Sequence, residues 1–106
     1  MNKSIKPSEL STIIIACEAG MGSSLMSVNA LKKKFKKAGI TTVKVMHKPA
    51  RAIPTDAKLI LFHQSLEKLV RGRVPEAMVI PFKHFFKDPA FDSLVESFVQ
   101  NTEITQ

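Results

Sequence analysis

The sequence predicts an α/β domain with a mainly parallel sheet and helices on both faces of that sheet. Short β-branched runs alternate with amphipathic segments along the chain. The first such run, residues 11–17, has the composition of a strand that is buried on both faces. The chain has 106 residues, of which 44% are hydrophobic, so we expect one domain with one core.

The N-terminal part of the chain is predicted to contain a strand and a long helix. We interpret residues 1–10 as a polar, proline-containing arm and residues 11–17 as the first strand. After a glycine- and serine-containing loop, apolar residues recur at three- and four-residue spacing, with lysines on the other face. We predict that this helix ends at Gly39, because glycine favours helix C-termini. The apolar positions of the helix are Leu25, Val28, Leu31, Phe35 and Ala38.

The remaining segments continue the alternation of strands and helices. Residues 40–48 alternate and are rich in β-branched side chains, which predicts a strand, and a loop follows at residues 49–57. Residues 58–63 and 77–82 predict two further strands, the last of them ended by Pro81, with a short helix between them that ends at Gly72. Residues 82–100 favour a closing helix with a break at Asp88 and Pro89. The predicted domain comprises residues 11–101, and residues 102–106 form a frayed polar tail.

The composition favours a soluble protein of a reducing compartment. No apolar run approaches the roughly 20 residues that are needed to span a bilayer, and the first residues lack the apolar core of a signal peptide. The single cysteine cannot form an internal disulfide. We therefore expect a cytoplasmic protein that does not itself span the membrane.

The positive charge of the chain is concentrated in one segment. The formal net charge is +7, and five of the 16 basic residues lie within residues 32–37. Tryptophan and tyrosine are absent, and no RNA-stacking signature or zinc-finger spacing is present, so we expect no nucleic-acid partner. The lysines are by default the solvated face of a helix; alternatively, they dock the chain on an acidic face of a partner.

Residues 17–24 combine a nucleophile with groups that bind phosphate. Cys17 falls at the C-terminal end of the first predicted strand, where α/β sheets bind ligands and helix N-termini point. The two glycines allow the backbone to approach an anion closely, the serines add hydroxyl donors, and the same positive field stabilises a thiolate. We therefore predict a phosphocysteine intermediate on Cys17. The candidate phosphate-binding residues are Glu18, Ala19, Gly20, Met21, Gly22, Ser23 and Ser24.

Several other interpretations of this region were weighed against the first. Cys17 by itself is typical of a small buried residue at a strand end, and Ser23 or Ser24 can simply cap the helix. The loop lacks the lysine and the spacing of a Walker A motif, and Leu25 stands at the third glycine of a dinucleotide fingerprint. The three histidines and the one cysteine have no zinc-ligand spacing, so we expect no metal and no cofactor.

The stretch CEAGMGSSLM, residues 17–26, resembles the active-site loop of enzyme IIB of the bacterial sugar phosphotransferase system, most closely its mannitol-type branch. The similarity continues through LKKKFKKAGI, LILFHQSLEKLVRGRVPEAMVI and FFKDPAFDSLVESFV, and it covers residues 11–100. The resemblance implies a single three-layer domain of the flavodoxin-like or Rossmann-like kind, with a four-stranded parallel sheet. It also implies a loop after the first strand similar to that of low-molecular-weight tyrosine phosphatases.

The same resemblance implies a function for the cysteine. Cys17 accepts a phosphoryl group from a phosphohistidine on enzyme IIA and passes it to a sugar or sugar alcohol bound in the membrane component IIC. The chain is then a phosphotransferase that needs no cofactor. His63 and Gln64 follow the third predicted strand and are accessory candidates beside the loop.

Four positions depart from the related patterns. Ser23 stands where the phosphatase pattern Cys-x5-Arg has its arginine, which favours transfer over hydrolysis because an arginine clamp stabilises the hydrolytic transition state. Glu18 replaces the usual aspartate, and Gln64 and Ser65 replace the arginine and aspartate of a common His-Arg-Asp triplet. The last departure motivates an alternative function, a regulatory module that signals its phosphorylation state to a transcription regulator.

Overall fold

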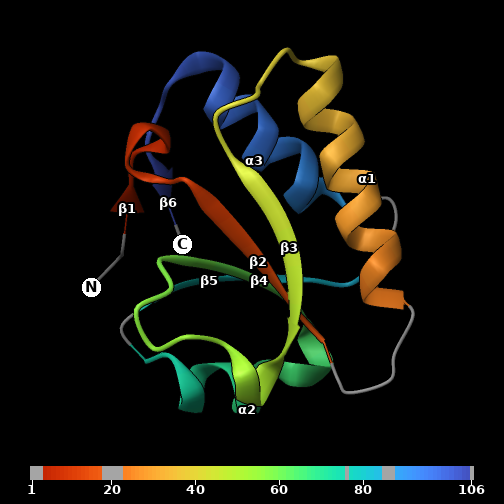
Figure 1. The fold of residues 1–106 in the computed structure, drawn as a ribbon, viewed down its shortest axis with the longest axis vertical. Helices are drawn as coiled ribbons and strands as arrows, with labels where there is room; N and C mark the ends of the chain where they lie inside the picture. The colour runs from red at the N-terminus through yellow and green to blue at the C-terminus, as the bar shows by residue number, and fades with distance from the viewer. Residues whose placement is uncertain (1–3, 18–22, 76, 85–87, 106) are drawn as a thin grey trace.

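Four parallel strands form the central sheet, in the order β3-β2-β4-β5 (Figure 1). The computed structural model describes residues 4–17, 23–75, 77–84 and 88–105. The strands are β2 (Thr12–Cys17), β3 (Lys44–Pro49), β4 (Leu59–His63) and β5 (Met78–Phe82). All three pairings are parallel, which confirms the predicted fold class and gives an arrangement of the flavodoxin-like type.

Both faces of the sheet are covered, and this explains the composition of the central strands. Leu59, Ile60, Leu61 and Phe62 of β4 are all fully buried, and Ile13 to Ala16 of β2 are buried as well. A strand with side chains packed on both of its faces has no polar positions to alternate with, so its sequence is a continuous apolar run. In the edge strand β3, by contrast, only Val45 is buried, and the other residues are partly or fully exposed.

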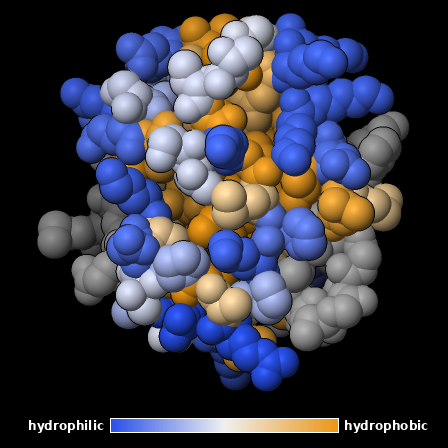
Figure 2. All heavy atoms as spheres, in the orientation of Figure 1, coloured by the Kyte–Doolittle hydropathy of each residue, from blue (hydrophilic) through white to orange (hydrophobic). Residues whose placement is uncertain are grey.

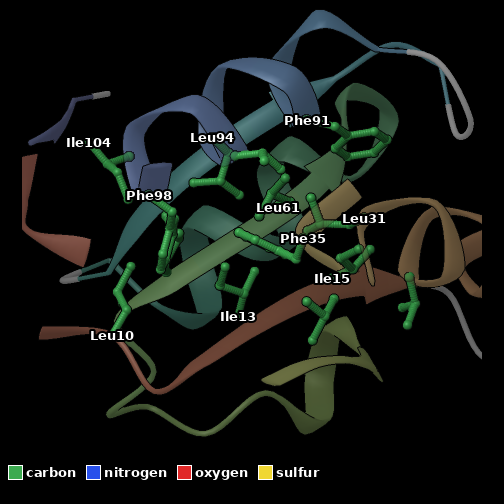
Figure 3. Close-up of a cluster of buried hydrophobic side chains, with 14 of the residues drawn as sticks. Leu10, Ile13, Ile15, Leu31, Phe35, Leu61, Phe91, Leu94, Phe98 and Ile104 are labelled. Carbon is green, nitrogen blue, oxygen red and sulfur yellow. The ribbon is translucent and has the colours of Figure 1, made fainter. Parts of the chain in front are cut away.

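One face of the sheet packs against α1 (Ser23–Lys37) and α3 (Pro89–Gln100). Figure 3 shows this core, in which Leu31 and Phe35 of α1 meet Phe91, Leu94 and Phe98 of α3 above β2 and β4. The rings of Phe35 and Phe98 meet edge to face with centroids 5.0 Å apart. This face therefore holds the two long helices in place relative to the strand ends.

The opposite face packs against a second apolar cluster that contains α2 (Glu67–Arg73) and the short 3-10 helix η2 (Ala50–Ala52). Val70 of α2 and Ile53 after η2 are fully buried there. Arg73 Nε donates a hydrogen bond of 2.9 Å to the Ile53 carbonyl oxygen, and so ties α2 to the segment that follows β3. Another 3-10 turn, η3 (Gln64–Leu66), leads from β4 into α2.

The ends of the two long helices follow their local sequences. Gly39 has a φ of 76°, its amide binds the Lys36 carbonyl, and the Ile40 amide binds the Phe35 carbonyl, so α1 ends in a Schellman motif as the glycine predicts. Asn101 takes the left-handed conformation at the end of α3. Asp88 caps the start of α3 and Pro89 is its first residue, which confirms the predicted break.

Two predicted element ends are wrong. α2 continues through Gly72 to Arg73, because Gly72 keeps an ordinary helical conformation and the chain turns only at Val74. Pro81 lies within β5 and does not end it. β5 pairs with β4 alone in this sheet, and an edge strand tolerates the missing amide of a proline.

Other boundaries differ from the prediction by a few residues or more. The strand predicted at residues 40–48 begins only at Lys44, and the loop predicted at 49–57 contains η2. The closing helix begins at Pro89, and Lys83 and His84 are not helical. Residues 85–87 lie outside the described part of the chain.

Parts of the predicted polar arm and of the predicted frayed tail form strands in the structure. β1 (Ser4–Ile5) pairs antiparallel with β6 (Ile104–Thr105), so the two ends of the chain form a small ladder beside the main sheet. Pro7 in η1 (Pro7–Glu9) and Leu10 are buried, and Ile104 is only 4% exposed. Leu10 and Ile104 extend the core of the α1 and α3 face. The polar composition of the tail gives no sign of this contact.

Candidate functional site

Cys17 is the last residue of β2, at the edge where all four parallel strands end. Its backbone is level with Pro49, the last residue of β3. On the other side, Ala16 pairs with Phe62, so His63 of β4 also ends beside it. Figure 1 shows the ends of β2 and β3 close together in the lower part of the view, with the first turn of α1 to their right. The structure thus places Cys17 at the ligand-binding edge of an α/β sheet.

The predicted phosphate-binding loop falls largely outside the described residues. Residues 18–22, which include Gly20 and Gly22, are not described, and neither are the side chains of Cys17, Ser23 and Ser24. The backbone of α1 begins at Ser23, so both serines lie in the first turn of the helix, not before it. The anion cradle and its phosphatase-like shape therefore remain predictions.

The start of α1 brings a positive field to this edge. An N-terminus presents unpaired amide hydrogens and about half a positive charge, and α1 is long enough, at 15 residues, for a full macrodipole. The buried Ser27 and Val28 fix its first turns against the sheet. Leu25 and Met26 are 48% and 51% exposed and form an apolar surface next to the loop. This edge therefore favours an anion and offers an apolar contact beside it.

His63 is a structural member of the site. Its Nδ1 accepts a hydrogen bond of 3.2 Å from the Ser65 amide and lies 2.8 Å from the Ser65 hydroxyl. Its Nε2 lies 3.2 Å from the Lys83 carbonyl oxygen, to which a protonated Nε2 donates. The ring also packs edge to face on Phe82. His63 thus joins the ends of β4 and β5, and both of its ring nitrogens lie within hydrogen-bond distance of these partners.

Gln64 lies at the same edge with an exposed side chain. It is the first residue of η3, and its carbonyl oxygen accepts the amide of Glu67. The turn is anchored by Leu66, which is buried. Gln64 is therefore held near Cys17 as an uncharged side chain that faces solvent.

Asp88 organises the chain between β5 and α3. Its Oδ1 accepts the Ala90 amide at 2.9 Å, and its Oδ2 accepts the amides of Lys83 and His84 at 2.7 and 3.2 Å. Burial raises the pKa of this carboxyl, but the three amide hydrogen bonds and the nearby charge of His84 outweigh that effect, so the pKa lies below its ordinary value of 3.8. The ionised carboxylate therefore fixes the backbone of Lys83 and His84 at the carboxyl edge of the sheet.

Sequence reasoning missed Arg51 and Lys83 as residues of this edge. Arg51 lies in η2, two residues beyond the strand partner of Cys17, and its side chain is exposed. Lys83 follows β5 directly. The sequence predicts only a loop for the segment of Arg51 and the start of a helix for that of Lys83. The parallel register between the strands brings both residues to the edge. A basic residue just after a predicted parallel strand is the signal that can find them.

The lysine-rich segment lies at the other end of α1. Lys32 is nine residues and Lys37 fourteen residues beyond the first helical residue, which is about 14 to 21 Å along the helix axis. Lys34 Nζ forms an ion pair of 2.7 Å with Asp92 of α3. Figure 2 shows hydrophilic side chains gathered over the upper part of α1. These lysines are therefore too far from Cys17 to bind a phosphoryl group on it.

Comparisons with known proteins agree with this arrangement. A family described as "PTS system, Lactose/Cellobiose specific IIB subunit" matches residues 12–97. The chain is 39% identical over 94 residues to the PTS system mannitol-specific EIICBA component of Buchnera aphidicola subsp. Acyrthosiphon pisum (strain APS), a match that covers 89% of this chain and 15% of that protein. It is 34% identical over 92 residues to the PTS system mannitol-specific EIICB component of Bacillus subtilis (strain 168), covering 87% of this chain and 19% of that protein.

An all-parallel sheet with a cysteine at the end of a central strand and a helix N-terminus beside it defines a class of α/β domains suited to handling phosphate. Within that class, the chain belongs to the IIB family of the sugar phosphotransferase system and is a phosphotransferase component. It spans less than a fifth of the length of the relatives just described. Among the described residues, no helix is long and apolar enough to cross a membrane.

Proposed function

We propose that this chain carries phosphoryl groups on Cys17, which it receives from a phosphohistidine of enzyme IIA and passes to a sugar alcohol bound in the membrane component IIC. The observation that carries the proposal is the position of Cys17, which ends β2 six residues before α1 begins. A helix N-terminus stabilises a thiolate beside it, and the carboxyl edge of a parallel sheet is where α/β domains bind their ligands. The relatives named for mannitol support mannitol as the substrate.

The first transfer is an attack of sulfur on phosphorus. The Cys17 thiolate forms the S–P bond while the N–P bond of the IIA phosphohistidine breaks, and the electron pair of that bond returns to the imidazole nitrogen. The proton lost by the thiol restores the neutral imidazole of IIA. The amides of residues 18–24 and the hydroxyls of Ser23 and Ser24 are proposed to hold the phosphoryl oxygens.

In the second transfer, Cys17 is the leaving group and the sugar alcohol is the nucleophile. A hydroxyl of the bound sugar alcohol attacks phosphorus, the S–P bond breaks, and Cys17 leaves as the thiolate. The hydroxyl proton passes to the medium or returns to the thiolate, so that the chain regains its starting form. The uncharged Ser23 at the position of the phosphatase arginine favours a phosphocysteine that survives between the two transfers.

The outer face of α1 supports partner docking. Leu25 and Met26 offer apolar contact beside the loop, and the exposed Lys32, Lys33 and Lys36 continue the same face away from it. An apolar centre with a charged rim is a common interface pattern, and lysines at a rim mainly speed association with an acidic partner. We therefore propose that IIA docks along this face in a salt-sensitive manner.

Gln64 favours a second candidate function. It places a neutral side chain at the site edge where a common family pattern has arginine. A chain that accepts phosphate but transfers it poorly to sugar would serve as a regulatory module, which reports its phosphorylation state to a transcription regulator.

The decisive experiment is incubation with phosphorylated IIA, followed by intact mass spectrometry. The parent chain is expected to gain one phosphoryl group on Cys17, and Cys17→Ser is expected to gain no phosphothiol. No adduct on the parent, or an unchanged adduct on the variant, would contradict the proposal. Adding IIC membranes and mannitol separates the two functions: Cys17-dependent mannitol phosphate supports the carrier, and its absence supports the regulatory module.

A further inference from the structure

We propose that a groove beside β3, bordered by Lys44, Lys48 and Lys58, is a contact surface for the anionic headgroups of a phospholipid bilayer. We call it the β3 groove. It has a volume of about 460 Å³ and lies on the face of the sheet that packs against α2. The inference goes beyond the proposed function, because it does not depend on phosphorylation of Cys17.

The β3 groove is open because α2 is too short to cover the whole face of the sheet. With seven residues, α2 is about 10 Å long, and it packs mainly on β4, β5 and η2. Ile14 of β2 and Met46 of β3 face the same side of the sheet and line the groove next to it. Pro54 and Ala57, from the segment between β3 and β4, also line it. The floor of the β3 groove is therefore apolar.

The register of the sheet places three lysines around this apolar floor. Lys48 and Lys58 line the groove directly. Side chains alternate along a strand, so Lys44 and Lys48 lie on the same face of β3 as Met46. Lys44 pairs with Thr12 of β2, and the register of β2 with β4 sets Lys58 level with Thr12 as well. Two strand spacings, about 10 Å, therefore separate the backbones of Lys44 and Lys58.

Few carboxylates neutralise these cations. None of the three lysines forms an ion pair with a described carboxylate. Lys58 Nζ instead donates a hydrogen bond of 3.4 Å to the Glu9 carbonyl oxygen. Asp56 is the one carboxylate among the described residues that line the groove. Residues 25–63 as a whole hold nine of the 16 basic residues and one of the nine acidic residues, so the β3 groove lies in the most positive part of the chain.

The kind of cation favours a fluid anionic surface over a specific protein partner. Lysine is depleted in protein interfaces, in which arginine and aromatic residues are enriched. Its ammonium is a point charge on a flexible stem, which suits mobile lipid phosphates. The chain has no tryptophan or tyrosine, and the phenylalanines of the described residues are all buried. The lysines therefore bind lipid phosphates, and the apolar floor contacts the glycerol region next to them.

Binding on this face leaves the opposite face of the sheet open. α1 packs on that opposite face, and its outer side is the surface on which IIA is proposed to dock. A domain held at a bilayer through the β3 groove therefore remains accessible to IIA. It is also concentrated near the membrane component that is proposed to receive its phosphoryl group.

The test measures co-sedimentation of the chain with two kinds of vesicle. One kind consists of phosphatidylcholine alone, and the other of phosphatidylcholine and phosphatidylglycerol in equal parts. We expect binding to the anionic vesicles only, and we expect it to weaken steeply as the salt concentration rises.

Two triple variants locate the contact. Replacing Lys44, Lys48 and Lys58 by glutamine should weaken binding to the anionic vesicles about a hundredfold, at about fivefold for each lysine. The matched control removes three charges from the exposed outer face of α1 and should weaken binding by less than about fivefold. Its substitutions are Lys32→Gln, Lys33→Gln and Lys36→Gln.

Asp56→Asn supplies a test in the opposite direction. It removes the carboxylate that lines the β3 groove and should strengthen binding to the anionic vesicles about fivefold. Unchanged or weaker binding would contradict the assigned surface. Urea unfolding of all variants is expected to match the parent, since the substituted side chains are at least partly exposed.

Several results would overturn the proposal. Equal weakening by the two triple variants would indicate a general attraction by net charge, and equal binding to both kinds of vesicle, or to neither, would exclude an anionic lipid surface. Full competition by soluble glycerol phosphate would indicate a site for small anions. A groove variant that binds vesicles normally but is no longer phosphorylated by IIA would indicate a protein interface. Vesicle binding needs no phosphoryl group, so failure of the proposed function shows separately, as a parent chain that IIA does not phosphorylate.

Discussion

Asp88 allows a sharp test of how one carboxylate organises the edge of the site. Its two oxygens accept three backbone amides, one at the start of α3 and two after β5. The side chain is 7% exposed. Asp88→Ala removes both acceptor oxygens, whereas Asp88→Ser keeps an acceptor for the Ala90 amide that caps the helix and removes the one shared by Lys83 and His84. Comparing the two variants therefore separates the contribution of the helix cap to stability from that of the hydrogen bonds to Lys83 and His84.

The expected losses follow from these contacts. Losing the cap costs about 1 kcal/mol. Each amide left without an acceptor costs about 1 kcal/mol at the low end of its range, because Lys83 and His84 are exposed and water replaces part of the bond. We expect the free energy of unfolding to fall by about 2 to 3 kcal/mol for Asp88→Ala and by about 1 to 2 kcal/mol for Asp88→Ser.

Urea unfolding with a constant m-value measures these differences. The pH dependence supplies a second check. The carboxylate has a lower pKa in the folded state than its ordinary 3.8, so its stabilisation is fully present above about pH 4 and is lost as the pH falls through the folded-state pKa. The gap between the parent and Asp88→Ser should therefore shrink in acid. Equal stabilities of the two variants, or a gap that widens below pH 4, would refute the reasoning.

Two further predictions concern the core and the chain ends. Phe91 of α3 is fully buried, so Phe91→Ala should lower the free energy of unfolding by about 3 to 5 kcal/mol. Val99→Ala, at a residue of the same helix that is 57% exposed, should change it by less than about 0.5 kcal/mol. Removal of residues 102–106 should cost about 2 kcal/mol, because it exposes the site of Ile104 and breaks the β1 and β6 pairing. A truncated chain that is as stable as the parent in urea would instead indicate that the tail is frayed and adds no stability.

Much of the site could be predicted because its signals are local. A β-branched run that ends in Cys17, followed by glycines, serines and an amphipathic helix, indicates a strand, a turn and a helix N-terminus without knowledge of any distant residue. The structure confirms that Cys17 ends β2 and that a long helix follows the loop, although α1 already begins at Ser23, which was predicted to precede it. Asp88 and Pro89 are a local signal of the same kind, since a capping residue and a first-turn proline need only each other.

Other features depend on partners far away in the chain. Nothing in the sequence around His63 indicates that the carbonyl oxygen of Lys83, twenty residues later, lies 3.2 Å from its second ring nitrogen. Pro81 looked like a strand end, but it is accommodated because β5 lies at the edge of the sheet. Ile104 looked like part of a loose tail, but it pairs with Ile5 from the other end of the chain.

The sequence alone therefore determined the fold class, the strand that ends at Cys17 and the helix that follows it, because the strand pattern, the loop residues and the helix signals lie within a few residues of one another. Only the tertiary structure decided which side chains share the edge with Cys17. Parallel register sets Pro49 level with Cys17 and so carries Arg51 beyond it, while the lysines of α1 are carried to the opposite end of their helix. Register and helix direction are properties of pairing between distant segments, and no local pattern encodes them.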